Sequence, residues 1–225
     1  MVTEELILLI SLLTSKKKIM KNKFKSLLLL SLTSLLTVSC VSDDDYVIPT
    51  VYDYAFNETF SDVPVGSGST EVAIDKEGWV NVNFLSTRLW HGRVYNDDKY
   101  AEFSSYYSNS GTSDEVWLIT PAIDLTSSNG EILSFTTKYR YSNGDVLKAY
   151  ISTDFDGNEA NINTSNWEEL NVILPSEDDV KTKSGDINLS SYNSTNVRIA
   201  FVYEGSKAAG LTTTCQLDDI KILKN

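Results

Sequence analysis

Few side chains in this sequence are placed to carry out covalent chemistry. His91 is the only histidine, and the chain has no Gly-x-Ser-x-Gly elbow that would present a nucleophilic serine. Carboxylates are numerous, so counting alone leaves a glycosidase-type pair open, but no spacing singles out one pair. Because Gly92 follows His91, we expect this histidine in an exposed loop. The sequence therefore predicts a protein that is not an enzyme.

The segment 88–98, which reads RLWHGRVYNDD, combines aromatic, basic and acidic side chains. An aromatic face supplies flat apolar area for a sugar ring, and polar groups orient its hydroxyls. We predict a ligand-binding loop that consists of Arg88, Trp90, Arg93, Tyr95 and Asp97. The alternative for Trp90 is a place in the core, and Tyr106 with Tyr107 offers a second aromatic pair of this kind.

Acidic residues dominate the charge of the chain. It contains 31 Asp and Glu against 19 Lys and Arg, which gives a formal net charge of −12. Nucleic acids and anionic membranes present phosphates, which need basic partners, so we expect no nucleic-acid partner. The two cysteines form no CxxC motif, which argues against a thiolate zinc site. Cys215 lies in a strand-like run and is expected to be a small buried hydrophobe.

Residues 20–40 have the organisation of a cleaved leader. Lys21, Lys23 and Lys25 precede an apolar run, 26–38, which is shorter than the roughly 20 residues that a membrane-spanning helix needs. The residues Leu-Thr-Val-Ser-Cys that end at Cys40 resemble a bacterial lipobox. The resemblance implies that residues 1–39 are removed and that Cys40 is diacylated, which anchors the protein stably. The alternative is an ordinary signal peptide before an unmodified cysteine, and translation is expected to begin at Met20.

The residues after Cys40 are strongly acidic. They resemble the surface-export signal of Bacteroidetes-type lipoproteins, and the matching residues are Ser42, Asp43, Asp44 and Asp45. The resemblance implies attachment to the outer membrane with the protein facing the cell exterior; the alternative is a solvated acidic tether. We expect residues 40–53 to link the anchor to a single domain, 54–225. Removing residues 1–39 takes away six lysines and two glutamates and changes the net charge from −12 to −16.

The remainder of the chain has the pattern of an all-β protein. Apolar residues alternate with polar ones in 80–84, 132–141 and 197–203, and Gly, Asn, Asp and Ser clusters separate such runs. We expect about ten antiparallel strands in a β-sandwich, since a parallel sheet would need intervening helices. The Asn-Gly pair at 143–144 predicts a hairpin. A single helical turn near 165–168 or 189–192 is compatible with the pattern.

The last strand changes its alternation. Cys215 and Leu217 have one parity, and Ile220 and Ile222 have the other. If both pairs are buried, one extra residue must be inserted, so we predict a β-bulge at Asp218-Asp219.

Several motifs occur in an order that resembles a known family. They are Phe56-Asn-Glu-Thr-Phe60, Gly78-Trp79, Tyr100-Ala-Glu-Phe-Ser-Ser-Tyr106, Trp117-Leu-Ile-Thr-Pro-Ala-Ile-Asp-Leu125, Tyr150-Ile-Ser-Thr-Asp-Phe-Asp-Gly157, Ile187-Asn-Leu-Ser-Ser-Tyr192, Val197-Arg-Ile-Ala-Phe-Val-Tyr203 and Leu217-Asp-Asp-Ile-Lys-Ile222. Together they resemble a choice-of-anchor J domain, related to cleaved-adhesin domains and more distantly to MAM domains. The resemblance implies a jelly-roll sandwich of the galactose-binding-like type. It also implies an extracellular binding or adhesion module without catalytic activity.

Members of this family often hold a structural calcium between their first and last strands. The resemblance implies Glu58, Asp218 and Asp219 as calcium ligands here, completed by other oxygens because Ca²⁺ takes six to eight. Relatives often carry an Asp-rich loop where this chain has 83–90 with Arg88, whose charge is wrong for calcium. The alternative is that these carboxylates are solvated. The Asp-rich stretch 154–159 lacks later calcium ligands, so we expect a turn there.

Two functions of different class follow from this reading. The first is a carbohydrate-binding module on a surface lipoprotein, with a glycan as partner. The second is a protein-interaction or adhesion module, or an accessory subunit of a cell-surface complex. An exposed aromatic ring beside polar groups would favour the first, and a broad apolar patch on one sheet would favour the second.

Overall fold

The computed structural model describes residues 11–17, 52–67, 69–109, 111–127 and 130–224. Residues 11–17 form a short helix, and no helix in the described ranges is long and apolar enough to cross a membrane. The predictions for Met20, Cys40 and the acidic residues 42–45 lie outside the described residues. Residues Val51–Asn225 form one compact unit.

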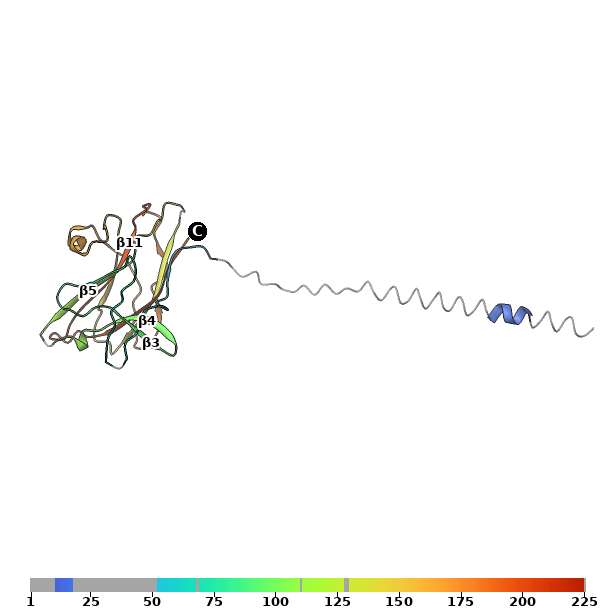
Figure 1. Cartoon of the computed structure of the whole chain (residues 1–225), viewed down its shortest axis with the longest axis horizontal. Helices are drawn as coiled ribbons and strands as arrows, with labels where there is room; N and C mark the ends of the chain where they lie inside the picture. The colour runs from blue at the N-terminus through green and yellow to red at the C-terminus, as the bar shows by residue number, and fades with distance from the viewer. Residues whose placement is uncertain (1–10, 18–51, 68, 110, 128–129, 225) are drawn as a thin grey trace, which may run out of the picture. The chain divides into compact units, whose positions relative to one another are not determined.

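This unit is a β-sandwich of two antiparallel sheets, which confirms the predicted all-β jelly-roll class (Figure 1). Sheet A contains, in spatial order, β10 (Ile187–Asn188), β6 (Ile132–Arg140), β12 (Thr214–Leu223), β4 (Asp98–Phe103) and β3 (His91–Tyr95), with β1 (Tyr54–Glu58) beside β12 and β9 (Thr182–Lys183) beside β6. Sheet B contains β2 (Val80–Asn83), β5 (Ser113–Ile119), β11 (Arg198–Ser206), β7 (Leu147–Ser152) and β8 (Glu168–Glu169). Two 3₁₀ helices, η1 (Ser105–Tyr107) and η2 (Glu159–Thr164), complete the elements.

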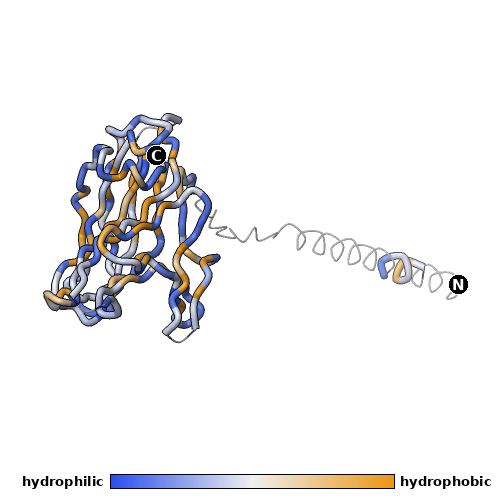
Figure 2. Tube along the Cα trace, turned by 60° about the vertical axis from the view of Figure 1, so that its left-hand side comes forward, coloured by the Kyte–Doolittle hydropathy of each residue, from blue (hydrophilic) through white to orange (hydrophobic). Residues whose placement is uncertain are grey.

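The core lies between the sheets, where apolar segments gather while hydrophilic residues occupy many of the loops (Figure 2). In β6, alternate residues are buried and half-buried along the strand, as the period of two predicts. Phe135 of β6 packs edge-to-face on Phe201 of β11, with ring centroids 4.9 Å apart. The outer face of sheet B carries a second apolar cluster, in which Trp117 packs on Trp167.

The first and last strands of the domain are paired. Tyr54 lies opposite Leu223, and the Lys224 amide donates to the Asp53 carbonyl at 2.8 Å. The register of β12 with β6 shifts between Asp218 and Lys221, and Asp219 has a φ of 51°. The predicted bulge is therefore confirmed, and it lets residues on both sides of it reach the core.

The predicted hairpin at 143–144 is wrong. The turn joins β6 of sheet A to β7 of sheet B, so the two strands are not paired. The Asn143 side chain explains the geometry, because its Oδ1 accepts from the Thr212 and Thr213 amides at 2.9 and 3.1 Å. The two-residue hairpin occurs instead at Asn96-Asp97, between β3 and β4, where both residues have positive φ.

The turn predicted for 154–159 is confirmed. Asp156 accepts from the Asn158 amide at 2.8 Å, which is an Asx turn leading into η2. The helical turn in this region occupies Glu159–Thr164 and therefore begins before the expected 165–168.

Candidate functional site

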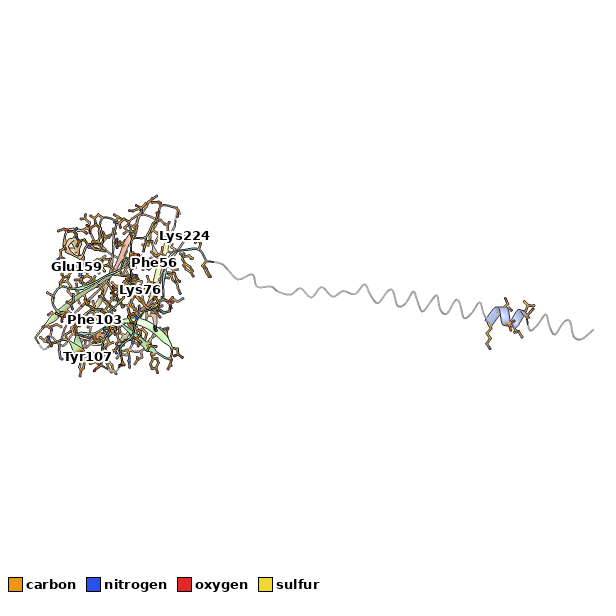
Figure 3. All side chains as sticks on the ribbon, viewed as in Figure 1. Phe56, Lys76, Phe103, Tyr107, Glu159 and Lys224 are labelled. Carbon is orange, nitrogen blue, oxygen red and sulfur yellow. The ribbon has the colours of Figure 1, made fainter. Side chains whose placement is uncertain are left out.

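Three tyrosines are exposed around one cleft. The relative exposures of Tyr106, Tyr107 and Tyr141 are 60%, 64% and 72%, although large aromatic rings usually bury most of their area. The cleft has a volume of about 400 Å³ and is lined by Tyr106, Tyr107, Tyr141, Asn143, Thr212 and Thr214. We call it the tyrosine cleft. Figure 3 places Tyr107 at the end of the domain away from Lys224.

The first wall of the cleft rests on a buried carboxylate. Asp114 is 2% exposed, and its oxygens accept from Asn83 Nδ2 at 3.0 Å, Ser105 Oγ at 2.6 Å, Ser108 Oγ at 2.7 Å and Ser86 Oγ. Burial alone would raise the pKa of Asp114, but these four donors together hold it below its usual value. Because Ser105 and Ser108 flank the two tyrosines, Asp114 fixes the segment that presents them.

A buried tyrosine joins this wall to the next. The Tyr203 hydroxyl accepts from the Ser105 amide at 3.1 Å and donates to the Thr213 carbonyl at 2.9 Å. Burial raises the pKa of Tyr203 to about 12, so the hydroxyl stays protonated and keeps its donor. The segments of η1 and of Thr212–Thr214 are thereby held at a fixed separation.

The second wall comes from the turn after β6. Tyr141 has a φ of 52°, a left-handed conformation that costs a bulky residue energy and turns the chain sharply. Asn143 holds this turn, because its Nδ2 donates to Thr212 Oγ1 at 2.9 Å and its Oδ1 accepts from the Thr212 and Thr213 amides and from Thr213 Oγ1. The rings are therefore presented by an ordered backbone, which lowers the entropic cost of binding a ligand.

A cation lies over each of the three rings. Arg88 is 5.7 Å from the Tyr107 ring centroid, Lys207 is 5.7 Å from that of Tyr106, and Arg140 is 5.3 Å from that of Tyr141. Such contacts fix the ring orientation and contribute about 0.5–1 kcal/mol each at exposed sites. The cleft thus offers three oriented tyrosine rings with their hydroxyls, two threonine hydroxyls and an amide, and its lining residues include no carboxylate, histidine or cysteine.

The structure divides the predicted loop 88–98. Trp90 is 0% exposed and its Nε1 donates to the Val116 carbonyl at 3.2 Å, so its prediction as a ligand contact is wrong and the alternative, a place in the core, is confirmed. The Trp90 ring packs in the core against two other aromatic rings. Its centroid lies 6.2 Å from that of Phe103 and 6.4 Å from that of Tyr203. Arg88 is mostly buried in an ion pair with Glu71. It does not line the cleft but supports its first wall, because its Nη1 donates to the Ser104 carbonyl and to Ser108 Oγ and its guanidinium lies over the Tyr107 ring.

The other three predicted ligand residues lie on β3 and its hairpin. Arg93 pairs with Glu102, with Nε 3.2 Å from Oε1, and Tyr95 is 66% exposed near the hairpin tip. Asp97 lies in the hairpin turn itself and borders a hollow next to Asp218. These residues belong to sheet A but line no part of the tyrosine cleft.

His91 is buried rather than exposed as the sequence predicts. It is 2% exposed on β3, and its Nε2 lies 3.6 Å from Glu71 Oε1 and 3.8 Å from Glu102 Oε1. The chain before Ala73 crosses this edge, since a Cβ at Gly92 would meet the Pro64 carbonyl oxygen at 2.3 Å. Glycine is therefore required by close packing, and the packing covers the histidine.

The predicted calcium ligands are not brought together as one set. Glu58 accepts from the Phe60 amide at 2.6 Å, and its Oε2 lies 2.7 Å from Lys76 Nζ, which also contacts Asp62. An ammonium thus occupies the position where a cation would bind Glu58. Among the described residues no group of three or more His, Cys, Asp or Glu is arranged to hold a metal. The geometry around Glu58 therefore does not fit a calcium site that includes all three predicted ligands. Calcium binding by this domain stays a prediction from the family resemblance.

Asp218 lies on the outer face of sheet A, since the neighbouring Leu217 points into the core. It is 7% exposed, accepts from the Asp219 amide at 2.7 Å, and lies 3.9 Å from Lys181 Nζ. Burial raises the pKa of Asp218 to about 6, and the nearby Asp219 adds to this. Asp219 itself contacts Lys221 Nζ at 2.9 Å. Cys215, in the same strand, is 0% exposed, which confirms it as a buried hydrophobe.

Comparisons with known proteins find similar solved structures at low identity. A search with models of protein families finds no match, and no curated protein matches. The chain resembles the K1 cleaved adhesin domain of Lys-gingipain from Porphyromonas gingivalis, with 15% identity, a TM-score of 0.47, and coverage of 76% of this chain and 98% of that one. It also resembles the CBM22-1 xylan-binding domain from Paenibacillus barcinonensis, with 11% identity, a TM-score of 0.43, and coverage of 77% and 96%.

A third similarity is to a family 29 carbohydrate-binding module complexed with mannohexaose. The identity is 14% and the TM-score is 0.37, with coverage of 68% of this chain and 86% of that one. At these values the similarities do not assign a ligand to this chain. The fold class rests on the strand pairing described above.

Proposed function

We propose that this domain is a non-catalytic carbohydrate-binding module and that the tyrosine cleft is its binding site. The observation that carries the proposal is the grouping of three exposed tyrosine rings with Asn143, Thr212 and Thr214 in one cleft. Sugar rings have apolar faces that stack on aromatic rings, and their hydroxyls need both donors and acceptors. Two of the similar solved structures are named for xylan binding and for a mannohexaose complex, but the proposal rests on the cleft and not on them.

The position of the cleft also suits an anchored protein. The chain enters the domain beside Leu223, at one end of β12, whereas Thr214 at the other end lines the cleft. A strand of ten residues separates these ends by about 30 Å. We propose a lipid anchor at Cys40 in the outer membrane with the domain facing the exterior, as in a lipoprotein with a choice-of-anchor J domain. In this proposal the anchor is attached on the side of Tyr54, and the cleft lies at the opposite end of β12.

The proposal predicts loss of binding when the rings are removed. In affinity electrophoresis against xylan, galactomannan, soluble cellulose derivatives and polygalacturonate, we expect at least one polymer to retard the wild-type domain. Tyr107→Ala and Tyr141→Ala should each weaken that binding about tenfold, because each ring contributes one stacking surface. Tyr52→Ala removes an equally exposed ring outside the cleft and serves as the control.

A protein ligand is the alternative outcome of this experiment. Phe84 and Leu85 follow β2 and are exposed. They come directly after Asn83, which donates a hydrogen bond to Asp114. Retardation by no polymer, together with unchanged behaviour of the tyrosine variants, would contradict carbohydrate binding. That result would favour a protein-binding or adhesion surface formed by these apolar side chains.

A further inference from the structure

The outer face of sheet A continues beyond the tyrosine cleft. Thr214 of β12 lines the cleft, and Gln216 and Asp218 follow it on the same face of the strand. These two residues line a second, smaller hollow of about 50 Å³ together with Tyr95 and Tyr100. The spacing of residues in a strand places Thr214 and Asp218 about 14 Å apart, so the two hollows belong to one elongated surface.

Polar side chains connect the two hollows. Thr214 pairs across the strands with Arg140, and Gln216 lies between Lys138 of β6 and Glu102 of β4. Gln216 Nε2 donates to Glu102 Oε2 at 3.0 Å. Thr214, Gln216 and Asp218 are at most 9% exposed, so a ligand on this face would mainly meet the charged ends of the longer side chains around them, such as Arg93 and Arg140. Guanidinium and carboxylate groups can add further hydrogen bonds to sugar hydroxyls.

An aromatic ring lies at each end of this surface. Tyr141 is at the cleft end, and Tyr95 lies exposed at the hairpin of β3 and β4. The small hollow beside Tyr95 has room for a substituent of a sugar and not for a whole ring. A ligand that used both ends would therefore stack on both tyrosines and run over the surface between them.

The charges on this face favour a neutral ligand. Arg93 lies 3.2 Å from Glu102, and Lys181 lies 2.7 Å from Asp98. Arg140 lies 2.8 Å from Asp179, which Lys138 also approaches at 4.0 Å, so each of these four cations already has a carboxylate partner. An acidic sugar would meet carboxylates at close range on a chain of net charge −12, whereas hydroxyls can bond to both members of an ion pair.

We propose that the ligand is a neutral linear polysaccharide, which lies along β12 from the tyrosine cleft to Tyr95. This inference rests on the proposed function and adds the charge class of the ligand and a second contact region. It distinguishes binding within a chain from recognition of a single terminal sugar.

The test is a length series measured by isothermal titration. The probes are cello-, manno- and xylo-oligosaccharides up to the hexasaccharide, with oligogalacturonates as the acidic class. We expect one neutral series to bind, and its hexasaccharide to bind about tenfold more tightly than the shortest member with measurable affinity. Tyr95→Ala should remove most of this gain and leave the shortest member unchanged, which also shows that the variant is folded.

The outcomes separate this inference from the proposed function. If Tyr95→Ala leaves the hexasaccharide affinity unchanged while Tyr107→Ala weakens it, the sugar binds in the cleft but does not extend along β12 to Tyr95. Tighter binding of oligogalacturonate than of every neutral series would contradict the prediction of a neutral ligand. The cation that would then pair with the sugar carboxylate is Lys207, which lies over Tyr106. Binding of no series would contradict both proposals.

Discussion

Replacing Asp114 with alanine is expected to lower the free energy of unfolding by about 3 kcal/mol. The carboxylate is buried and accepts four side-chain hydrogen bonds, so its loss leaves three serine hydroxyls without this acceptor and removes one hydrogen bond of Asn83. Urea unfolding followed by tryptophan fluorescence measures this change. Because Ser105 and Ser108 flank Tyr106 and Tyr107, the variant should also bind glycan more weakly than the wild type.

The matched control is Asp114→Asn, which keeps one acceptor oxygen and should cost less than the alanine variant. The pH dependence gives a second check. Since the pKa of Asp114 is held below its usual value, its contribution is present above pH 4 and is lost as the pH falls through the lower folded-state pKa. The wild type should therefore lose more stability in acid than Asp114→Ala. Equal stability of all three proteins at pH 7 would show that this carboxylate does not support the cleft.

Replacing Asp218 with asparagine is expected to stabilise the domain at pH 7.5, by on the order of 2 kcal/mol. A folded-state pKa of about 6 lies above the unfolded value of about 3.9, so the folded protein binds the proton more tightly. Stability then falls as the pH rises from 4 to 6, and the cost is complete above 6. The Asp218→Asn substitution removes that cost, keeps the acceptor for the Asp219 amide, and should raise the melting temperature at pH 7.5 but not at pH 4.

Calcium predicts the opposite sign at this position. If Asp218 and Asp219 held a structural calcium, Asp218→Asn would lower the melting temperature, and EDTA would lower that of the wild type by several degrees. Melting curves with calcium chloride and with EDTA therefore decide between a desolvated carboxylate and a metal ligand. Asp219→Asn gives a second comparison: it should lower the melting temperature if Asp219 binds calcium, and change it little otherwise, since Asp219 is more exposed and contacts Lys221.

Local patterns predicted much of the fold because antiparallel strands with one buried face leave a direct trace in the sequence. The alternation in 132–141 predicts β6, and the parity change between Leu217 and Ile220 predicts the bulge. The hairpin predicted from the Asn-Gly pair at 143–144 was wrong because a turn motif does not show whether the strands on either side of it join the same sheet. The long-range bonds of Asn143 to Thr212 and Thr213 decide that question.

The candidate site was harder to predict because its residues come from three separate segments. The order of β4, β12 and β6 in sheet A brings the segments of Tyr106, Thr212 and Tyr141 together, and no local spacing encodes this order. The sequence indicated Tyr106 and Tyr107 as a candidate aromatic pair for ligand binding. For Tyr141 and Asn143 it indicated only a turn. The sequence leaves Trp90 open between the binding loop and the core, and it predicts that His91 is exposed. Packing, which sequence composition does not reveal, buries both.

The central claim is that sugar binds in the tyrosine cleft, and mapping of amide chemical shifts tests it most directly. The isotope-labelled domain is titrated with the oligosaccharide that binds it most tightly. The account predicts saturable shifts of amides in 104–108, 141–143 and 212–216, with Tyr52 and Lys224 at the other end unchanged. Shifts confined to Phe84 and Leu85, to the outer face of sheet B, or to the end near Lys224 would contradict it.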